Sequence, residues 1–388
     1  MSRARLVAVV VGGLLLLVVP FYVEEFWLRT GFAICGAVVG ALGLSLLLGT
    51  AGQLSLAHSF FLAVGAIGYT FVADSPGRTR SDELSGLGWP PLLGLLVGVF
   101  LAGVAGLAFS PIAARLRGIY LGVASLALVF LGQHVLNSWT SVTGGFNGRS
   151  VPDFDLFGFA FADTPRLVVL GVPFRESERL WYFGLALALA AYLFARNLVR
   201  SRPGTALQAV RDSEIAASVM GVNVQRYKAG AFLVSSAYAG LSGVMYALSI
   251  GSVAPESFGL YVSIQYLAMV ILGGLVSLGL GSPGGAVLGA VFVTALPLVL
   301  QRYADELPLV SGAGEDGLAA GEAARYLYGL AIVLVVLFQP AGFAGLARRF
   351  RTVTAGTVQG STPDEVRGSG PGGRSRRRAR AADRGVQQ

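Results

Sequence analysis

The side chains able to do chemistry are few in this sequence, and three of them gather in one short stretch. Gln53, Ser55 and His58 interrupt an otherwise apolar run. In a segment that crosses a bilayer, such groups cost free energy unless they find partners or line a cavity. These three residues are therefore candidates for a translocation pathway. The alternative is that His58 simply forms a hydrogen bond to a neighbouring helix.

Sites for enzymatic chemistry are missing from the sequence. A nucleotide-binding P-loop needs a lysine followed by Ser or Thr, but the only lysine, Lys228, is followed by Ala229. His58 and His134 are too far apart in sequence for a zinc-type pair, and the single Cys35 allows neither an internal disulfide nor a cysteine-based metal site. We expect no enzyme, no cofactor and no metal. Partner subunits would bind any ATP, since the apolar segments also lack the ionisable groups typical of ion-coupled carriers.

The composition identifies the solvent that the chain needs. Its 388 residues are 54% hydrophobic and 13% charged, with a mean hydropathy of +0.68, whereas a soluble domain is about 25% charged. So few charged residues cannot provide the polar surface of a soluble domain of this size, so we expect an integral membrane protein. The net charge of +8 comes largely from arginines after residue 347. This favours a basic tail that contacts membrane lipid, or is simply solvated, over nucleic-acid binding.

Crossing the hydrocarbon core takes about 20 apolar residues per helix, and the sequence offers several such segments. They are 6–23, 31–49, 54–73, 90–109, 119–137, 180–198, 228–250, 262–280, 284–301 and 326–344. We therefore predict an all-α polytopic membrane protein with about ten transmembrane helices (about 8–10). The segment at 54–73 could instead be short or re-entrant, because it contains Ser55 and His58. The first segment lacks a small-residue cleavage site, so we interpret it as an uncleaved helix and not a signal peptide.

Basic residues near the helix ends predict the orientation. They concentrate in loops 110–118 and 199–227 and in the tail, whereas the intervening loops carry more acids. With an even number of spans, both termini would lie in the cytoplasm, and the chain would be a multi-pass protein of the plasma (inner) membrane. The predicted domains are a transmembrane domain over 1–350, with an ordered external loop at 138–179, and a disordered basic cytoplasmic tail over 351–388.

The longest predicted cytoplasmic loop, 199–227, contains a candidate docking helix between Pro203 and Gly221. Mostly small residues recur in it at steps of three and four, which places them on one helical face. They are Ala206, Ala209, Ser213, Ala216 and Met220. Arg211 and Glu214 fall on the opposite side, where they could fix the register of a partner subunit. The alternative is a surface helix packed on its own membrane domain.

Glycines are dense between residues 262 and 300. Gly273, Gly274, Gly285 and Gly289 permit close helix contact, and the last two lie four residues apart on one helix face. We predict that they form a moving interface between two antiparallel spans joined near Pro283. Static tight packing is the alternative interpretation.

Six stretches of the chain together carry a resemblance to a known family. The stretches are GTAGQLSLAHSFFLAVGA, LRGIYLGVASLAL, NSWTSVTGGFNG, SRPGTALQAVRDSEIAASVMGVNVQRYK, AGLSGVMYA and APESF. They resemble the branched-chain amino-acid ABC transporter permeases, specifically the LivM-type membrane subunit, and they run in that family's order. Each stretch alone is a weak signal, whereas their joint occurrence is specific.

The resemblance implies an ABC importer permease fold for residues 1–350. Importers of this class combine two homologous permease subunits, two ABC ATPase subunits and an external solute-binding protein. Loop 199–227 would then be the ATPase-coupling loop, similar to the EAA loop of these importers, although Ile215 separates Glu214 from the alanines. Its candidate residues are Ala206, Ala209, Arg211, Glu214, Ala216, Ala217 and Gly221.

The resemblance also predicts a function, namely the movement of branched-chain or other aliphatic amino acids across the plasma membrane, energised by separate ATPase subunits. Within the same family, a permease for urea or short amides is the alternative. Outside the family, the alternative is a stand-alone secondary carrier or channel, which buried carboxylates in the spans would favour.

Overall fold

The structure, a computed structural model, describes residues 12–75, 84–156, 159–161, 167–169, 172–274 and 283–303, with short pieces between 310 and 334. These residues all belong to one compact unit, Met1–Arg348. The beginning of the predicted first span, most of 302–325 and of the predicted span 326–344, and the tail 351–388 lie outside the described residues.

The described chain is predominantly helical, which confirms the prediction of an all-α polytopic membrane protein. Within the described residues, seven helical segments are long and apolar enough to cross a membrane. They are α2 (Glu25–Ser45) with the π-helical turn Leu46–Thr50, α4 (Pro91–Arg115), α5 (Ile119–Ser138), α7 (Glu176–Arg200), α10 (Val224–Ile250), α11 (Leu260–Gly274) with the 3-10 turn Pro255–Phe258, and α12 (Pro283–Arg302). The apolar helices α3 (His58–Ala73) and Gly12–Phe21 are shorter.

The remaining elements are short connections. The helices are α6 (Thr140–Thr143), α8 (Arg202–Asp212) and α9 (Glu214–Val219), with 3-10 turns at Val19–Phe21 and Gly145–Asn147. The strands pair two by two: β1 (Arg149–Ser150) with β6 (Ser252–Val253), β2 (Asp155–Leu156) with β3 (Phe159–Ala160), β4 (Leu167–Val169) with β5 (Val172–Phe174), and β7 (Val310–Ser311) with β8 (Leu318–Ala319). The last pair is parallel and the others are antiparallel.

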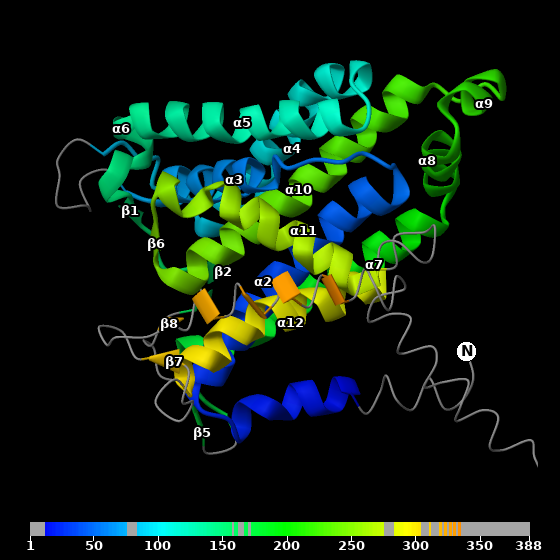
Figure 1. Ribbon diagram of the computed structural model, residues 1–388. Coiled ribbons are helices and arrows are strands. Elements are labelled where there is room, and N and C mark those ends of the chain that lie inside the picture. The colour runs from blue at the N-terminus through cyan, green and yellow to red at the C-terminus, as the bar shows by residue number, and fades with distance from the viewer. Residues whose placement is uncertain are drawn as a thin grey trace, which may run out of the picture. The chain divides into compact units, whose positions relative to one another are not determined.

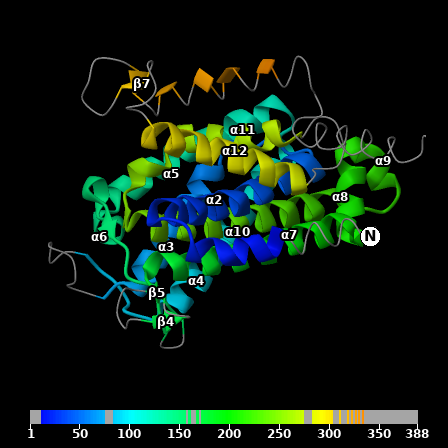
Figure 2. The ribbon, with the colours of Figure 1, turned by 90° about the horizontal axis from the view of Figure 1, so that it is seen from below.

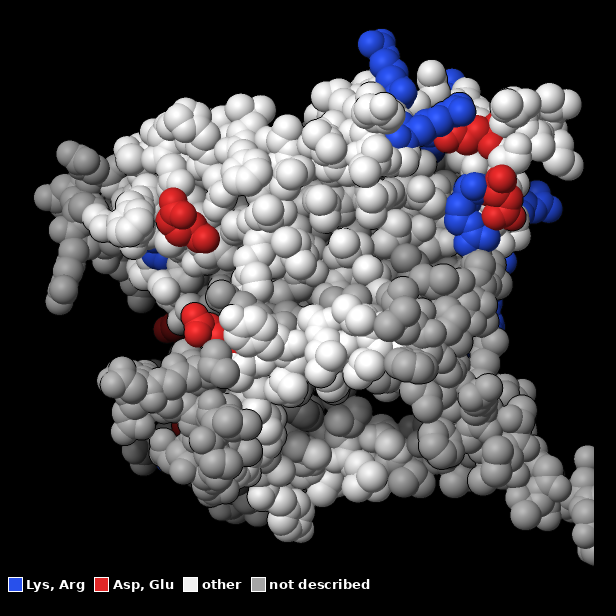
Figure 3. Space-filling view, in the orientation of Figure 1, with Lys and Arg blue, Asp and Glu red and all other residues white. Residues whose placement is uncertain are grey.

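The connections gather at two ends of the helix bundle. Figure 1 shows α8 and α9 at one end, called the α9 end below, and β1, β6 and α6 at the other, called the β1 end. Arg117, which follows α4, forms an ion pair of 2.8 Å with Glu214 of α9, so loops 110–118 and 199–227 share the α9 end. Which end faces the cytoplasm stays a prediction. Among the described residues visible in Figure 3, charged side chains gather at these ends, and the surface between them is almost uncharged, as a bilayer requires.

The interior is built around α10, which packs against α2, α3 and α4 (Figures 1 and 2). Three glycines bring α3, α4 and α10 together: a Cβ atom on Gly65 would overlap the backbone of Gly240, and one on Gly98 would lie 2.5 Å from the carbonyl oxygen of Gly65. Since glycine has no side chain, these helices meet at backbone contact, the close approach typical of membrane helix packing.

A buried ion pair fixes the β1 end. Arg149 of β1 lies 3.0 Å from Asp74, which follows α3, and both side chains are almost fully buried. The Arg149 guanidinium also donates to the carbonyl oxygens of Val142, at 2.6 Å, and Ser85, at 3.2 Å. A buried charge is tolerated when it is paired and hydrogen-bonded in this way. The first part of the predicted external loop is therefore ordered and tied to α3.

Candidate functional site

The predicted docking helix between Pro203 and Gly221 is two helices, and the prediction of one helix was wrong. Ser213 has an extended backbone, with φ −161° and ψ 111°, and separates α8 from α9. Its hydroxyl accepts a hydrogen bond from the backbone N–H of Ala216 at 3.2 Å, which caps the N-terminus of α9. The sequence resembled one helix because Ser suits both the cap and the small-residue series. The small residues consequently do not form one stripe.

The predicted coupling residues are spread over differing environments. Ala206, Ala209 and Arg211 of α8 are half-buried, and Ala217 of α9 is buried, whereas Ala216 is exposed. Gly221 follows α9 with φ +85°, a conformation that favours glycine. These residues shape and support the α8–α9 turn, and most of them are not its free surface.

The free surface of α9 is apolar. Ile215 is 72% exposed, Val219 is 82% exposed, and the adjoining Met220 is 81% exposed. Ile215 and Val219 lie four residues apart and thus on one side of the helix. Sequence reasoning placed Met220 in the mostly small-residue series but did not single out Ile215 and Val219, although large apolar side chains at this spacing in a predicted polar loop are the signal that finds them. We call the three residues the α9 patch.

Glu214 is bound by cations of its own chain. Its Oε1 lies 2.7 Å from Nζ of Lys228 on α10, and its Oε2 lies 2.8 Å from Nη2 of Arg117. The Lys228 side chain is 1% exposed and that of Glu214 is 21% exposed. The carboxylate thus joins the first residue of α9 to α10 and to the loop after α4.

Arg211 likewise contacts the membrane domain. Its Nη1 donates to the carbonyl oxygen of Gly49 at 2.8 Å, and its aliphatic part covers Gly52, which has φ +67°. A Cβ atom on Gly52 would lie 2.5 Å from Cγ of Arg211. Gln53, Arg117, Arg211 and Glu214 border a polar hollow of about 240 Å³ at this end.

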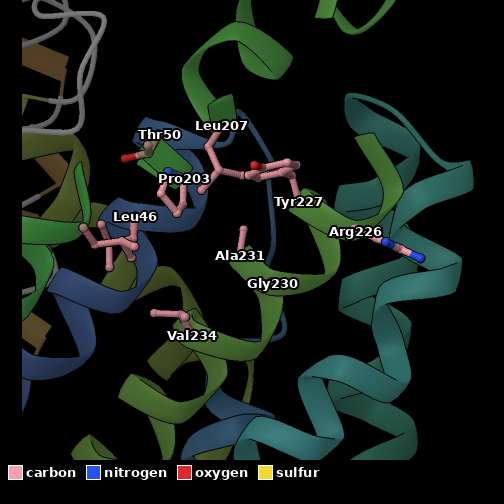
Figure 4. Close-up of a pocket in the computed structure, with 10 residues that line it drawn as sticks. Leu46, Thr50, Pro203, Leu207, Arg226, Tyr227, Gly230, Ala231 and Val234 are labelled. Carbon is pink, nitrogen blue, oxygen red and sulfur yellow. The ribbon is translucent and has the colours of Figure 1, made fainter. Parts of the chain in front are cut away.

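An apolar pocket of about 270 Å³ lies beneath α8. Leu46 and Thr50 from the π-helical turn after α2, Leu207 from α8, and Tyr227 and Ala231 from α10 border it (Figure 4). Arg226 also belongs to its border, but Figure 4 shows the guanidinium directed away from the other labelled side chains. Between α8 and the membrane helices there is therefore an unfilled space, and Arg211 supplies a direct contact beside it.

The three polar pathway candidates are buried next to an unwound segment. After the π-helical turn, residues 51–57 are not helical, and α3 begins only at His58. The backbone N–H of Leu56 donates to the hydroxyl of Ser125 on α5 at 2.8 Å, and that of Ala57 donates to the hydroxyl of Ser55 at 3.3 Å. Because α3 then reaches the β1 end, residues 54–73 cross the bundle with an unwound start and do not form a re-entrant segment.

A cavity of about 410 Å³ lies among α2, α3, α10, α11, α12 and the 3-10 turn before α11. The hydroxyl of Tyr266 lies 2.8 Å from that of Ser242, which donates to the carbonyl oxygen of Gly36 at 2.7 Å, so Tyr266 is the donor to Ser242. The His58 ring lies 4.9 Å from the Tyr266 ring, centroid to centroid, but His58 does not line the cavity. Its described lining contains no charged residue. Sequence reasoning missed this cavity, for which Ser242, Tyr246 and Ser249 on one side of α10 were the signal.

Three of the four predicted interface glycines, Gly273, Gly285 and Gly289, meet within one helix pair. A Cβ atom on Gly273 of α11 would overlap the carbonyl oxygen of Gly285 on α12, and one on Gly289 would overlap that of Met269. Gly274 ends α11 with φ +103°. Close contact is thus present between these helices, and movement at this contact stays a prediction.

Known proteins match most of the chain. A family model described as branched-chain amino acid transport system, permease component, matches residues 25–336. The high-affinity branched-chain amino acid transport system permease protein LivM of Escherichia coli is 30% identical over 337 residues, which are 83% of this chain and 71% of that protein. The probable branched-chain amino acid transport permease protein LivM of Methanocaldococcus jannaschii is 23% identical over 83% of this chain and 89% of its own length.

A relative with another named solute also matches. The autoinducer 2 import system permease protein LsrC of Salmonella paratyphi B is 28% identical over 61% of this chain and 66% of its own length. No solved structure matches the chain.

Proposed function

This chain belongs to the branched-chain amino acid transport permease family, and on that premise we propose that it moves branched-chain or other aliphatic amino acids across the plasma membrane. It is a multi-pass permease subunit of an ABC importer of the branched-chain amino acid type, and not an enzyme. The observation that carries the choice of solute is the 30% identity to the Escherichia coli LivM protein over 83% of this chain.

The same proposal includes partners. Two ABC ATPase subunits, a second homologous permease and an external solute-binding protein would complete the importer. The α9 patch is the surface that we assign to an ATPase, because two large apolar side chains on α9 and a third directly after it are exposed, and the Glu214 ion pairs hold this short helix in place. Exposed apolar residues grouped in this way mark a surface that contacts a protein or a membrane, and we assign this one to a protein. The α9 end would then be cytoplasmic, in agreement with its arginines.

Uptake by the assembled importer tests the solute. The chain is produced together with the ATPases, second permease and binding protein of its importer, in cells that lack their own uptake of branched-chain amino acids. The entry of labelled leucine, isoleucine and valine into these cells is then measured. We expect ATP-dependent uptake that disappears when this chain is omitted. Normal assembly without uptake of any of the three amino acids would contradict the proposal.

Urea or a short amide is a second candidate solute. The observation that favours it is the uncharged described lining of the 410 Å³ cavity, which suits a neutral polar molecule. Labelled urea and acetamide, tested in the same cells, distinguish the two candidates. Uptake of urea but not leucine would replace the first proposal by the second.

A further inference from the structure

We propose that the cavity bordered by α2, α10, α11 and α12 is a transit site for the solute within this single subunit, and that Tyr266 forms its closed floor. The site would take a small solute with no net charge and an aliphatic part. This inference rests on the proposed importer function, and it adds where the solute stops and what its chemistry must be.

The size and the walls of the cavity fit such a solute. Its volume of about 410 Å³ lies in the range of about 300–1,000 Å³ that is usual for small-molecule sites. Leu62, Val262, Met269 and Val293 supply apolar walls, against which an aliphatic group can be buried. The site is therefore large enough and apolar enough for an aliphatic side chain.

The polar groups of the cavity are hydroxyls and one amide. Ser249, Gln265 and Thr294 belong to its lining, and the Thr294 hydroxyl is buried without a hydrogen-bond partner among the described residues. The oxygen of this hydroxyl is closed to solvent, and a buried hydroxyl without a partner is destabilising, so its rotation into the cavity toward a solute or a water would remove a cost. Thr294 is the residue from which we expect direct contact with a solute.

The uncharged lining of the cavity excludes solutes with a net charge, and it binds other solutes weakly enough to release them. A solute with net charge would lose its hydration and find no counter-ion among the described lining residues, which is costly in a medium of low dielectric. A zwitterion has no net charge, although its ammonium and its carboxylate each still need hydrogen-bond partners, for which the hydroxyls, the amide and water are available. Binding of this kind is weak, and a site on a transport route must release what it binds.

The floor separates the cavity from the unwound segment. Tyr266 is held by its hydrogen bond to Ser242, and it can approach α2 because Gly40 has no side chain: a Cβ atom there would overlap the Tyr266 ring. His58 lies directly behind this ring, and residues 51–57 lead from it to the polar hollow that Gln53 borders. Displacement of the Tyr266 ring would join the cavity to these buried polar residues.

Cysteine labelling in the assembled importer tests whether a solute occupies the cavity. The native cysteine is first removed by Cys35→Ser, and Thr294→Cys is then introduced as a nearly isosteric probe. A membrane-impermeant methanethiosulfonate is added from the side of the binding protein, without solute and with saturating leucine, acetamide, glutamate or lysine. Phe146→Cys, at a side chain that is 82% exposed at the β1 end, is the control.

We expect the reagent to label Thr294→Cys, and we expect leucine to slow this labelling about tenfold. Glutamate and lysine should not change the labelling rate of Thr294→Cys, and no solute should change that of Phe146→Cys. Slowing by acetamide alone would keep the transit site and assign it to a short amide. Equal labelling with and without every solute, in an importer that still takes up leucine, would overturn the inference while the proposed function stands. Absence of leucine uptake by the wild-type importer would instead contradict the proposed function.

A cavity-filling pair gives a second, independent measurement. Thr294→Phe fills the cavity, whereas Val291→Phe adds the same ring at a position of α12 that is 39% exposed and does not border the cavity. We expect Thr294→Phe to lower leucine uptake about tenfold, because the solute loses its space, and Val291→Phe to leave uptake within about twofold. Both complexes are quantified in the membrane. Equal uptake by the two variants at equal amounts would contradict the transit site.

Discussion

Lys228 and Glu214 form an ion pair of 2.7 Å in which the lysine side chain is 1% exposed and the glutamate side chain is 21% exposed. The pair joins the first residue of α9 to the membrane helix α10. Arg117 binds the other carboxylate oxygen at 2.8 Å. The sequence pattern had suggested that Glu214 seats an ATPase directly. In the structure its ion pairs hold α9 in the position where the apolar patch is exposed, and a direct contact of Glu214 with an ATPase stays a prediction.

The two members of this pair should respond unequally to removal. Glu214→Ala leaves a buried ammonium without its partner, and we expect a loss of about 3 kcal/mol of stability, the lower end of the range for broken buried pairs because Glu214 is partly exposed. Lys228→Met leaves Glu214 bound to Arg117 and in reach of water, so its cost should be smaller. Thermal unfolding of the purified importer measures both.

Arg117→Ala is the control for the exposed partner. Its side chain is 68% exposed, and we expect an effect of at most about 1 kcal/mol. Equal destabilisation by Glu214→Ala and Arg117→Ala would show that the buried lysine does not determine the stability of this turn.

The contact between Arg211 and Gly52 should affect transport by an amount that backbone strain alone does not explain. Gly52→Ala places a methyl group against the Arg211 side chain at φ +67°, whereas Gly118→Ala acts at φ +56°, where no atom of the described part of the chain lies within 4 Å of the new methyl group. A positive φ strains alanine at both positions, and the strain is larger at Gly118, whose ψ of −128° lies outside the left-handed helical region. We expect Gly52→Ala to lower the ratio of uptake to assembled complex, and Gly118→Ala to leave this ratio unchanged. The same ratio for both variants would indicate that only strain acts.

The membrane class of the chain could be predicted from sequence because it depends on composition alone. Long apolar runs such as 228–250 and 284–301 became α10 and α12, with ends shifted by a few residues. The unwound segment 51–57 was harder to predict. Its apolar residues continue the pattern of a span, and only its contacts, such as that between Leu56 and Ser125, show why it need not be helical.

The candidate site could be predicted only where neighbours in sequence act together. The loop 199–227 was found, but the break at Ser213 depends on anchors distant in sequence, among them Gly49 and Lys228. The cavity was not found for the same reason. Its residues come from several helices, and an uncharged hydroxyl such as that of Thr294 is common in membrane helices and gives no signal by itself.

The α9 patch should be required for binding of the ATPase. Val219→Asp places a charge in the centre of the exposed apolar surface, and Ser218→Asp places the same charge at the adjacent exposed position outside the patch. We expect the first to weaken ATPase binding by about 1–2 kcal/mol, roughly tenfold in affinity, and the second to have little effect. Co-purification at graded ATPase concentrations measures the difference. Unchanged binding by Val219→Asp would place the ATPase elsewhere.

The glycine contact between α11 and α12 allows the last prediction. Both helices border the proposed transit cavity, through Tyr266 and Met269 on α11 and Thr294 on α12. A side chain at Gly289 would meet the carbonyl oxygen of Met269, so Gly289→Ala must separate the helices, at a cost of about 1–3 kcal/mol for overpacking. If the contact exists in only one transport state, this cost shifts the population of states without unfolding the subunit.

We therefore expect Gly289→Ala, and more strongly Gly285→Leu, to lower uptake about tenfold while the importer still assembles. Gly230→Ala is the matched control, because Gly230 lies in α10 with no atom of the described residues within 4 Å of its missing side chain, and alanine there should be neutral or slightly stabilising. Labelling of cysteines along the cavity should report one dominant state in the first two variants.

Wild-type uptake by Gly289→Ala would show that the helices do not meet this closely. Loss of the whole complex from the membrane would show that the glycines provide static packing alone, since a contact confined to one state leaves the other state able to assemble.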